Sequence, residues 1–135
     1  MKLAIVGSRT FDNYELLVDT IFRNVNLLSN VQSIVSGGAT GADSLAERFA
    51  EEHLIEKIIF KPNWNFYGKS AGYKRNVDIV QNSDLVMVFW DGKSKGAEHD
   101  VKIAKDLKKQ LIVVYYLTGK IEKFNLDNDI INLYI

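Results

Sequence analysis

The sequence predicts an α/β domain of the Rossmann-like, doubly wound type, with a mainly parallel sheet of about five strands flanked by helices. Two observations indicate this fold. Short apolar runs alternate with amphipathic helical patterns along most of the chain, and the runs at 84–90 and 110–116 are apolar at nearly every position. Continuous apolar runs are typical of strands that helices cover on both faces of a parallel sheet.

The expected strands are five short runs bounded by glycine or polar residues. They are KLAIVG at 2–7, VQSIVS at 31–36, EKIIFK at 56–61, DLVMVFW at 84–90 and QLIVVYY at 110–116. Their length and their content of β-branched residues match buried strands.

Four helices are expected between the strands, at about 13–28, 41–52, 71–81 and 97–108. Asp12 and Glu15 have the spacing of a capping box at the start of the first helix. In each helix the apolar residues recur every three or four positions, which predicts one buried face.

The chain of 135 residues has the length of a single domain, 1–135, with 118–135 as a C-terminal extension. The end of this extension, at 125–135, is rich in isoleucine, leucine and tyrosine. Such an apolar tail predicts either a last strand or short helix that packs on its own domain, or a contact in a homo-oligomer.

Composition excludes several classes of site. The chain has no cysteine, which rules out disulfides, thiolate metal sites and cysteine catalysis. His53 and His99 are far apart and match no ligand spacing, so we expect no metal and no cofactor. The apolar run at the N-terminus is too short for a signal peptide, and no stretch has the length of a membrane span. We therefore expect a cytoplasmic protein without membrane contact.

Polar, glycine-containing loops follow the first four expected strands. Parallel strands present their carboxyl ends at one edge of the sheet, where ligands of such folds bind. We therefore expect these loops to form one ligand-binding crevice. Its candidate residues are Gly7, Ser8 and Arg9 after the first strand; Ser36, Gly37, Gly38, Thr40, Gly41 and Asp43 after the second; Lys69, Arg75 and Asn76 after the third; and Trp90, Asp91, Gly92, Lys93, Gly96 and Ala97 after the fourth.

The loop SGGATG at 36–41 leads directly into a helix. Its glycines allow backbone N–H groups to approach an anion, and the helix N-terminus favours negative charge. Asp43 follows in the first helical turn, where it either caps the helix together with Thr40 or accepts hydrogen bonds from the diol of a ribose. The candidates for stacking on a base are the aromatic residues Trp64, Phe66, Tyr67, Tyr73 and Trp90.

Four segments occur in a fixed order: GSRTF at 7–11, SGGATGAD at 36–43, YKRN at 73–76 and WDGKSKGAEHDVKIA at 90–104. On these segments the sequence, from Lys2 to Val114, resembles the SLOG superfamily. This superfamily includes the LOG phosphoribohydrolases and the DprA/Smf DNA-processing proteins. The resemblance is closest to the small stand-alone YspA-like, cpYpsA-related branch of phage and bacterial proteins.

The resemblance implies a domain that binds a nucleotide or a nucleotide-derived ligand, such as a nucleoside phosphate or an ADP-ribose-like molecule, as a sensor or sequestering module. The alternative is a LOG-type phosphoribohydrolase that cleaves the N-glycosidic bond of a nucleoside monophosphate, with Arg75, Glu98 and Asp100 as the catalytic residues. His99 and Asp100 stand at the two glutamate positions of the LOG motif, and this departure favours binding over hydrolysis.

A third function, DprA-like binding of single-stranded DNA, is also within the range of the superfamily. The net charge is zero, with 17 basic and 17 acidic residues. Proteins that neutralise many phosphates usually carry a basic excess. We therefore expect a nucleotide-type small molecule as the partner and do not expect nucleic acid.

Overall fold

The computed structural model describes residues 1–26 and 30–126. These residues form a six-stranded sheet with the order β3-β2-β1-β4-β5-β6. The strands are β1 (Lys2–Gly7), β2 (Ser33–Ser36), β3 (Glu56–Ile59), β4 (Leu85–Trp90), β5 (Gln110–Tyr115) and β6 (Lys120–Phe124). The first five are parallel, and β6 is antiparallel to β5. The chain builds the sheet outward from β1 in one direction and from β4 in the other, which confirms the doubly wound fold.

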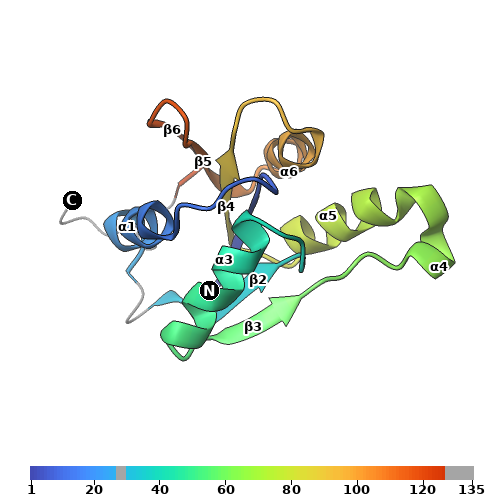
Figure 1. The fold of residues 1–135 in the computed structure, drawn as a ribbon, viewed down its shortest axis with the longest axis horizontal. Coiled ribbons are helices and arrows are strands. Elements are labelled where there is room, and N and C mark those ends of the chain that lie inside the picture. The colour runs from blue at the N-terminus through green and yellow to red at the C-terminus, as the bar shows by residue number, and fades with distance from the viewer. Residues whose placement is uncertain (27–29, 127–135) are drawn as a thin grey trace.

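Helices cover both faces of the sheet (Figure 1). The long helices are α1 (Tyr14–Asn24), α3 (Ala42–Glu52), α5 (Ala71–Gln81) and α6 (Lys95–Asp106). Helices α1 and α3 pack on one face, and α5 and α6 pack on the other. Within residues 1–26 and 30–126, none of the helices combines the length and the apolar character needed to cross a bilayer.

The core has two layers because side chains alternate between the two faces of each strand. On β1, Leu3 and Ile5 pack towards α1 and α3, whereas Ala4 and Val6 pack towards α5 and α6. Strand β4 alternates in the same way. Both faces of these strands are buried, which explains why their sequences are apolar at consecutive positions.

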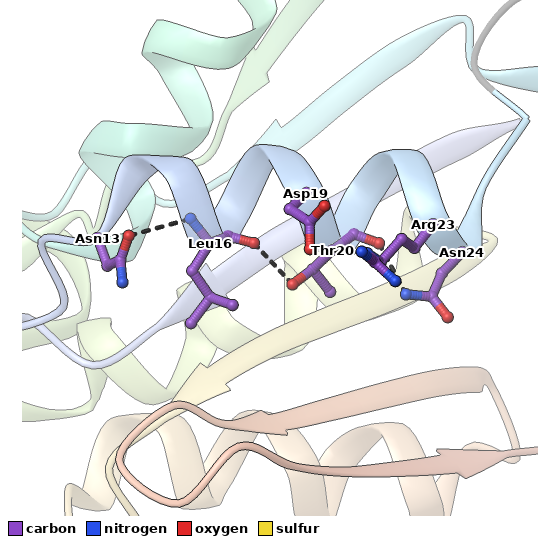
Figure 2. A network of polar contacts seen from close by, with 6 residues as sticks. All are labelled: Asn13, Leu16, Asp19, Thr20, Arg23 and Asn24. Carbon is purple, nitrogen blue, oxygen red and sulfur yellow. Dashed lines mark hydrogen bonds and ion pairs between the residues drawn. The ribbon is translucent and has the colours of Figure 1, made fainter. Parts of the chain in front are cut away.

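The start of α1 differs from the prediction. Asn13, and not Asp12, is the N-cap, and its Oδ1 accepts a hydrogen bond of 3.0 Å from the Leu16 N–H (Figure 2). The helix ends at Asn24, earlier than the predicted residue 28, because Val25 has an extended backbone. Further contacts along the helix link Leu16 to Thr20, Thr20 to Asn24 and Asp19 to Arg23.

Two other regions contain elements that the sequence did not predict. Strand β6 lies in the expected C-terminal extension and pairs with β5 from Leu111–Phe124 to Tyr115–Lys120. The loop after β3 contains the short helix α4 (Trp64–Tyr67) and the 3-10 turn η1 (Gly68–Ser70). The predicted element or oligomer contact at 125–135 falls mostly outside the described residues.

Candidate functional site

A cavity of about 320 Å³ lies at the carboxyl edge of the sheet, and we call it the switch-point cavity. Its lining comes from the loop after β1, the loop after β4, the first turn of α6 and side chains of α3 and α5. Strands β1 and β4 are neighbours at the point where the strand order reverses. This is the position where doubly wound folds leave a crevice for a ligand.

A second cavity, of about 410 Å³, adjoins the first, and we call it the glycine-loop cavity. It is lined by the loop at 37–40 together with Pro62, Trp64 and Gly72. Arg9, Ala39 and Arg75 line both cavities. The two cavities therefore form one crevice along the edge of the sheet, with two arginines at their junction.

The glycines of the loop after β2 allow neighbouring chains to approach closely. A Cβ atom on Gly37 would lie 2.6 Å from Arg75 Nη1 and 2.7 Å from Asp43 Oδ2. Gly41 has a φ of +77°, and a Cβ there would lie 2.4 Å from the backbone oxygen of Ser8. These glycines thus bring the loops after β1 and β2 and helix α5 together at the crevice.

The N-terminus of α6 lines the switch-point cavity through Lys95, Gly96 and Ala97. The N-cap residue, Ser94, makes no side-chain capping bond; its hydroxyl lies 2.9 Å from the Ser8 hydroxyl. Asp91 Oδ1 accepts hydrogen bonds from the N–H groups of Ser94 (2.8 Å) and Lys93 (2.9 Å), and these bonds lower the pKa of Asp91. The first N–H groups of a helix have no intrahelical partners and carry a partial positive charge. The cavity therefore has one side suited to an anion.

Two buried carboxyl groups, Asp43 and Asp100, line the same cavity, and each residue is 5% exposed. Burial raises the pKa of Asp43, against the opposing effects of the Ala39 N–H (3.3 Å) and the Arg75 charge. The pKa of Asp100 is raised well above its usual value by burial and by the nearby charge of Asp43. Asp100 Oδ1 has no hydrogen-bond partner among the described residues. This side of the cavity therefore favours at least one protonated carboxyl group.

Arg75 is fixed at the junction of the two cavities. Its Nη1 donates to the Gly37 carbonyl at 2.6 Å, and its Nε donates to Asn76 Oδ1 at 2.9 Å. Its charge lowers the pKa of both Asp43 and Asp100, although burial outweighs this effect in each case. The arginine lies close enough to both carboxyl groups to couple to them electrostatically.

The structure brings most of the sequence-predicted residues together. The switch-point cavity contains Gly7, Ser8, Arg9, Asp43, Arg75, Asn76, Asp91, Gly96, Ala97 and Asp100. The glycine-loop cavity adds Gly37, Gly38 and Thr40. Outside both linings lie Ser36, Gly41, Lys69, Trp90, Gly92 and Lys93. The Ser36 hydroxyl, for example, donates to the Ile5 carbonyl within the sheet at 2.8 Å.

The structure does not bring the three predicted hydrolase residues together. Arg75 and Asp100 share the switch-point cavity, but Glu98 is exposed and lines a separate cavity with Trp90 and Tyr115. Successive residues of a helix are turned by about 100°. Ala97 and Asp100, three residues apart, can therefore share a face that Glu98 cannot.

Thr10, Ser94 and Lys95 also line the switch-point cavity, and the sequence reasoning missed them. The available signal was Ser94, because serine directly before a helix is a common N-cap. Helix α6 begins at Lys95, two residues before the predicted start. That error left Ser94 and Lys95 in an apparent loop.

Comparison with known proteins identifies related chains. A family model described as the YspA, cpYpsA-related SLOG family matches residues 1–67. The Gene 61 protein of Mycobacterium phage D29 is 28% identical over 110 residues, covering 77% of this chain and 88% of the phage protein. DNA processing protein A from Helicobacter pylori, studied for its single-stranded DNA binding mode, has a similar structure, with a TM-score of 0.64 and 26% identity. The similarity covers 84% of this chain but 65% of that one.

The structural similarity overturns the expectation that excluded nucleic acid, because a protein that binds single-stranded DNA shares this fold at 26% identity. The exclusion relied on the zero net charge of the whole chain. Net charge does not report the local field, and Arg9, Arg75 and Lys95 all line the switch-point cavity. The family match over residues 1–67 and the shared fold confirm the predicted resemblance of this chain to the SLOG superfamily and its YspA, cpYpsA-related family.

Proposed function

We propose that this protein binds a nucleotide or nucleotide-derived ligand in the crevice at the carboxyl edge of the sheet. The observation that carries the proposal is the composition of the switch-point cavity. An uncapped helix N-terminus and two arginines lie in the same cavity as two buried carboxyl groups. A nucleotide needs both kinds of partner, because it joins an anionic phosphate to a sugar with hydroxyl groups.

The phosphate fits the side formed by α6. The N–H groups of Lys95, Gly96 and Ala97 can donate to phosphate oxygens, and the partial positive charge of a twelve-residue helix adds to this attraction. Arg9 and Arg75 supply full positive charges at the junction of the cavities. A guanidinium group can donate two parallel hydrogen bonds to a phosphate.

The sugar fits the side formed by Asp43 and Asp100. A carboxylate accepts hydrogen bonds from hydroxyl groups, and a protonated carboxyl group also donates one. Asp100 Oδ1 lacks a partner among the described residues, so a ligand hydroxyl would satisfy a buried oxygen.

The base fits the glycine-loop cavity, where Trp64 is 56% exposed. Stacking of an aromatic side chain on a base contributes about 1–3 kcal/mol and does not require a particular base. The position of Trp64 therefore supports binding of nucleotides as a class.

The placement of Glu98 favours binding without hydrolysis. The LOG-type assignment needs Arg75, Glu98 and Asp100 at one reacting sugar, and Glu98 lies outside the crevice that holds the other two. A domain that holds its ligand without cleaving it would act as a sensor or a sequestering module.

Single-stranded DNA is the second candidate ligand. Two observations favour it: the similarity to a DNA-processing protein, and the continuity of two cavities through Arg9 and Arg75. A strand presents a phosphate and a base in each of its units, but the deoxyribose inside the strand has no free hydroxyl group. The phosphate and base contacts are therefore common to both candidates, whereas the contacts of the sugar hydroxyls with Asp43 and Asp100 belong to the free nucleotides.

Isothermal titration with 5′-AMP, ADP-ribose and a twelve-nucleotide thymidine strand tests the proposal and distinguishes the two candidate ligands, a free nucleotide and single-stranded DNA. We expect at least one probe to bind, and we expect Arg75→Gln to weaken that binding about tenfold or more, because a hydrogen bond to a charged group contributes roughly 1.5–3 kcal/mol. Arg23→Gln, on α1 and paired with Asp19, is the matched control and should bind as the unmodified protein does.

The pattern of binding identifies the ligand class. Binding of the free nucleotides supports the first candidate, and binding of the strand without them supports the second. If chromatography detects free base released from 5′-AMP, the protein is a hydrolase and not a binding module. If no probe binds, or if Arg75→Gln and Arg23→Gln behave alike, the proposed site is wrong.

A further inference from the structure

A chain of hydrogen bonds connects Arg75 to a histidine that does not line the crevice. Arg75 Nε donates to Asn76 Oδ1 at 2.9 Å, and Asn76 Nδ2 lies 3.1 Å from His99 Nδ1. His99 is on α6, so the chain crosses from one helix of this face to the other. The ring of His99 stacks on Tyr73 with a centroid distance of 4.1 Å.

The directions of these hydrogen bonds are fixed by the guanidinium group. Arginine can only donate, so the Asn76 atom that faces Arg75 must be its oxygen. The Asn76 amide nitrogen must then donate to His99 Nδ1, and Nδ1 must be an acceptor. His99 is therefore neutral and carries its proton on Nε2.

The surroundings of His99 agree with a neutral ring. Its Nε2 atom is buried and has no hydrogen-bond partner among the described residues. Burial lowers the pKa of His99, and the charge of Lys102 lowers it further. The titratable or charged residues of α5 are Tyr73, Lys74, Arg75 and Asp78, and those of α6 besides His99 are Lys95, Glu98, Asp100, Lys102, Lys105 and Asp106. Lys74 and Asp78 pair with each other at 2.7 Å.

We propose that His99, acting through Asn76, is a positioning residue that aims the Arg75 guanidinium at the junction of the two cavities; its role in ligand binding rests on the proposed function. The Nδ1 acceptor holds the Asn76 amide in one orientation, and that orientation presents Oδ1 to Arg75 Nε. A guanidinium held at both Nε and Nη1 has a fixed plane, which a bidentate contact with a phosphate requires.

Loss of the acceptor would change the environment of Arg75 without removing its charge. The Asn76 amide would be free to rotate, and Arg75 would keep its bond to the Gly37 carbonyl. The attraction of the nearby Asp43 carboxyl group would then draw the guanidinium away from the ligand position. A basic residue would remain in the crevice but in the wrong orientation.

Two variants separate the acceptor from the ring. His99→Phe keeps an aromatic ring for stacking on Tyr73 but removes the acceptor. His99→Asn removes the ring but places an amide oxygen near the position of Nδ1. His53→Phe is the matched control. The His53 ring stacks on Phe49, and its Nδ1 forms a hydrogen bond with the Phe49 backbone oxygen, on the other face of the sheet.

The first measurement needs no ligand. Long-range proton–nitrogen NMR at pH 7 should show His99 as the neutral Nε2–H tautomer, and the Arg75 Nε–H signal should exchange slowly with water. His99→Phe should speed this exchange, and His99→Asn should restore it. An Nδ1–H tautomer, a protonated ring, or an Arg75 signal that is the same in all three proteins would overturn the proposal.

The second measurement is the affinity for 5′-AMP. We expect His99→Phe to weaken binding roughly fivefold, the equivalent of one neutral hydrogen bond, and His99→Asn to recover most of the loss. If the unmodified protein binds 5′-AMP and His99→Phe binds equally well, the positioning role is wrong while the proposed function stands. If the NMR results are as expected but no nucleotide or strand binds, the proposed function fails and the positioning of Arg75 stands.

Discussion

At the scale of single residues, two buried carboxyl groups give the crevice its chemistry. The Asp43 carboxyl group accepts a hydrogen bond from the Ala39 N–H and interacts with the charge of Arg75. Asp100 Oδ1 has no hydrogen-bond partner among the described residues. Burial of both residues in the same cavity makes it unfavourable for both to be charged. The protonation state of Asp100 therefore links the crevice to the stability of the fold.

Asp100→Asn should stabilise the protein at neutral pH. The folded-state pKa of Asp100 is raised, so folding favours the protonated form. Its contribution to stability is complete below the unfolded pKa of about 3.9 and is lost as the pH rises through the folded value. Asparagine removes this loss, so the gain in unfolding free energy should grow from pH 4 to pH 7 in urea titrations. Glu56→Gln, on the exposed surface of β3, is the control, and a gain for Asp100→Asn that does not vary with pH would contradict the assignment.

Gly41→Ala should destabilise the fold more than Gly92→Ala. Both glycines have positive φ values, +77° and +84°, so alanine is strained at both by about 1–2 kcal/mol. A Cβ at Gly41 would also lie 2.4 Å from the Ser8 backbone oxygen, whereas a Cβ at Gly92 meets nothing within 4 Å. We expect a further loss of about 1–3 kcal/mol at Gly41, measured by urea unfolding. Equal losses would show that the close approach of the two loops is not required.

At the scale of the elements, the N-cap of α1 offers a direct comparison of prediction and structure. Asn13→Ala should lower the unfolding free energy by about 1 kcal/mol, because it removes the hydrogen bond to the Leu16 N–H. Asp12→Ala, at the cap position that the sequence pattern favoured, should change it by no more than a few tenths of a kcal/mol. Thermal and urea unfolding measure both. A larger loss of unfolding free energy for Asp12→Ala than for Asn13→Ala would show that Asp12, the predicted residue, is the N-cap.

Elements with a long periodic pattern could be predicted from the sequence. Helix α5 (Ala71–Gln81) has the predicted bounds, since its buried residues recur at helical spacing. Helix α4 spans only Trp64–Tyr67, which is too short to show a period. Strand β6 (Lys120–Phe124) is short and largely exposed, and its place in the sheet depends on pairing with β5 and not on its own pattern.

The candidate site could be predicted in outline for a similar reason. Gly7, Gly38 and Arg75 follow strands whose carboxyl ends meet at one edge, so their loops had to converge. Glu98 could not be placed in this way, because one residue of helical phase decides whether a side chain faces the crevice or turns away from it. Asn76 was predicted as a ligand contact, but its connection to His99 depends on the packing of α5 against α6.

At the scale of the whole molecule, the strand order determines where the crevice lies. The sheet reverses between β1 and β4, and the loops after these strands line the switch-point cavity. Zero net charge gave the wrong expectation about nucleic acid because it is a sum over the whole chain and does not report that Arg9, Arg75 and Lys95 line this cavity. The distribution of charge over the fold, and not its sum, determines which anions the protein can bind.

A proton–nitrogen NMR titration of the unmodified protein with 5′-AMP and with the thymidine strand tests the location of binding most directly. We predict that the largest shifts occur in the backbone amides of Ser8, Arg9, Gly38, Gly96 and Ala97, which line the two adjoining cavities. Shifts confined to the cavity formed by Trp90, Glu98, Lys102 and Tyr115, or no shifts with either probe, would contradict it.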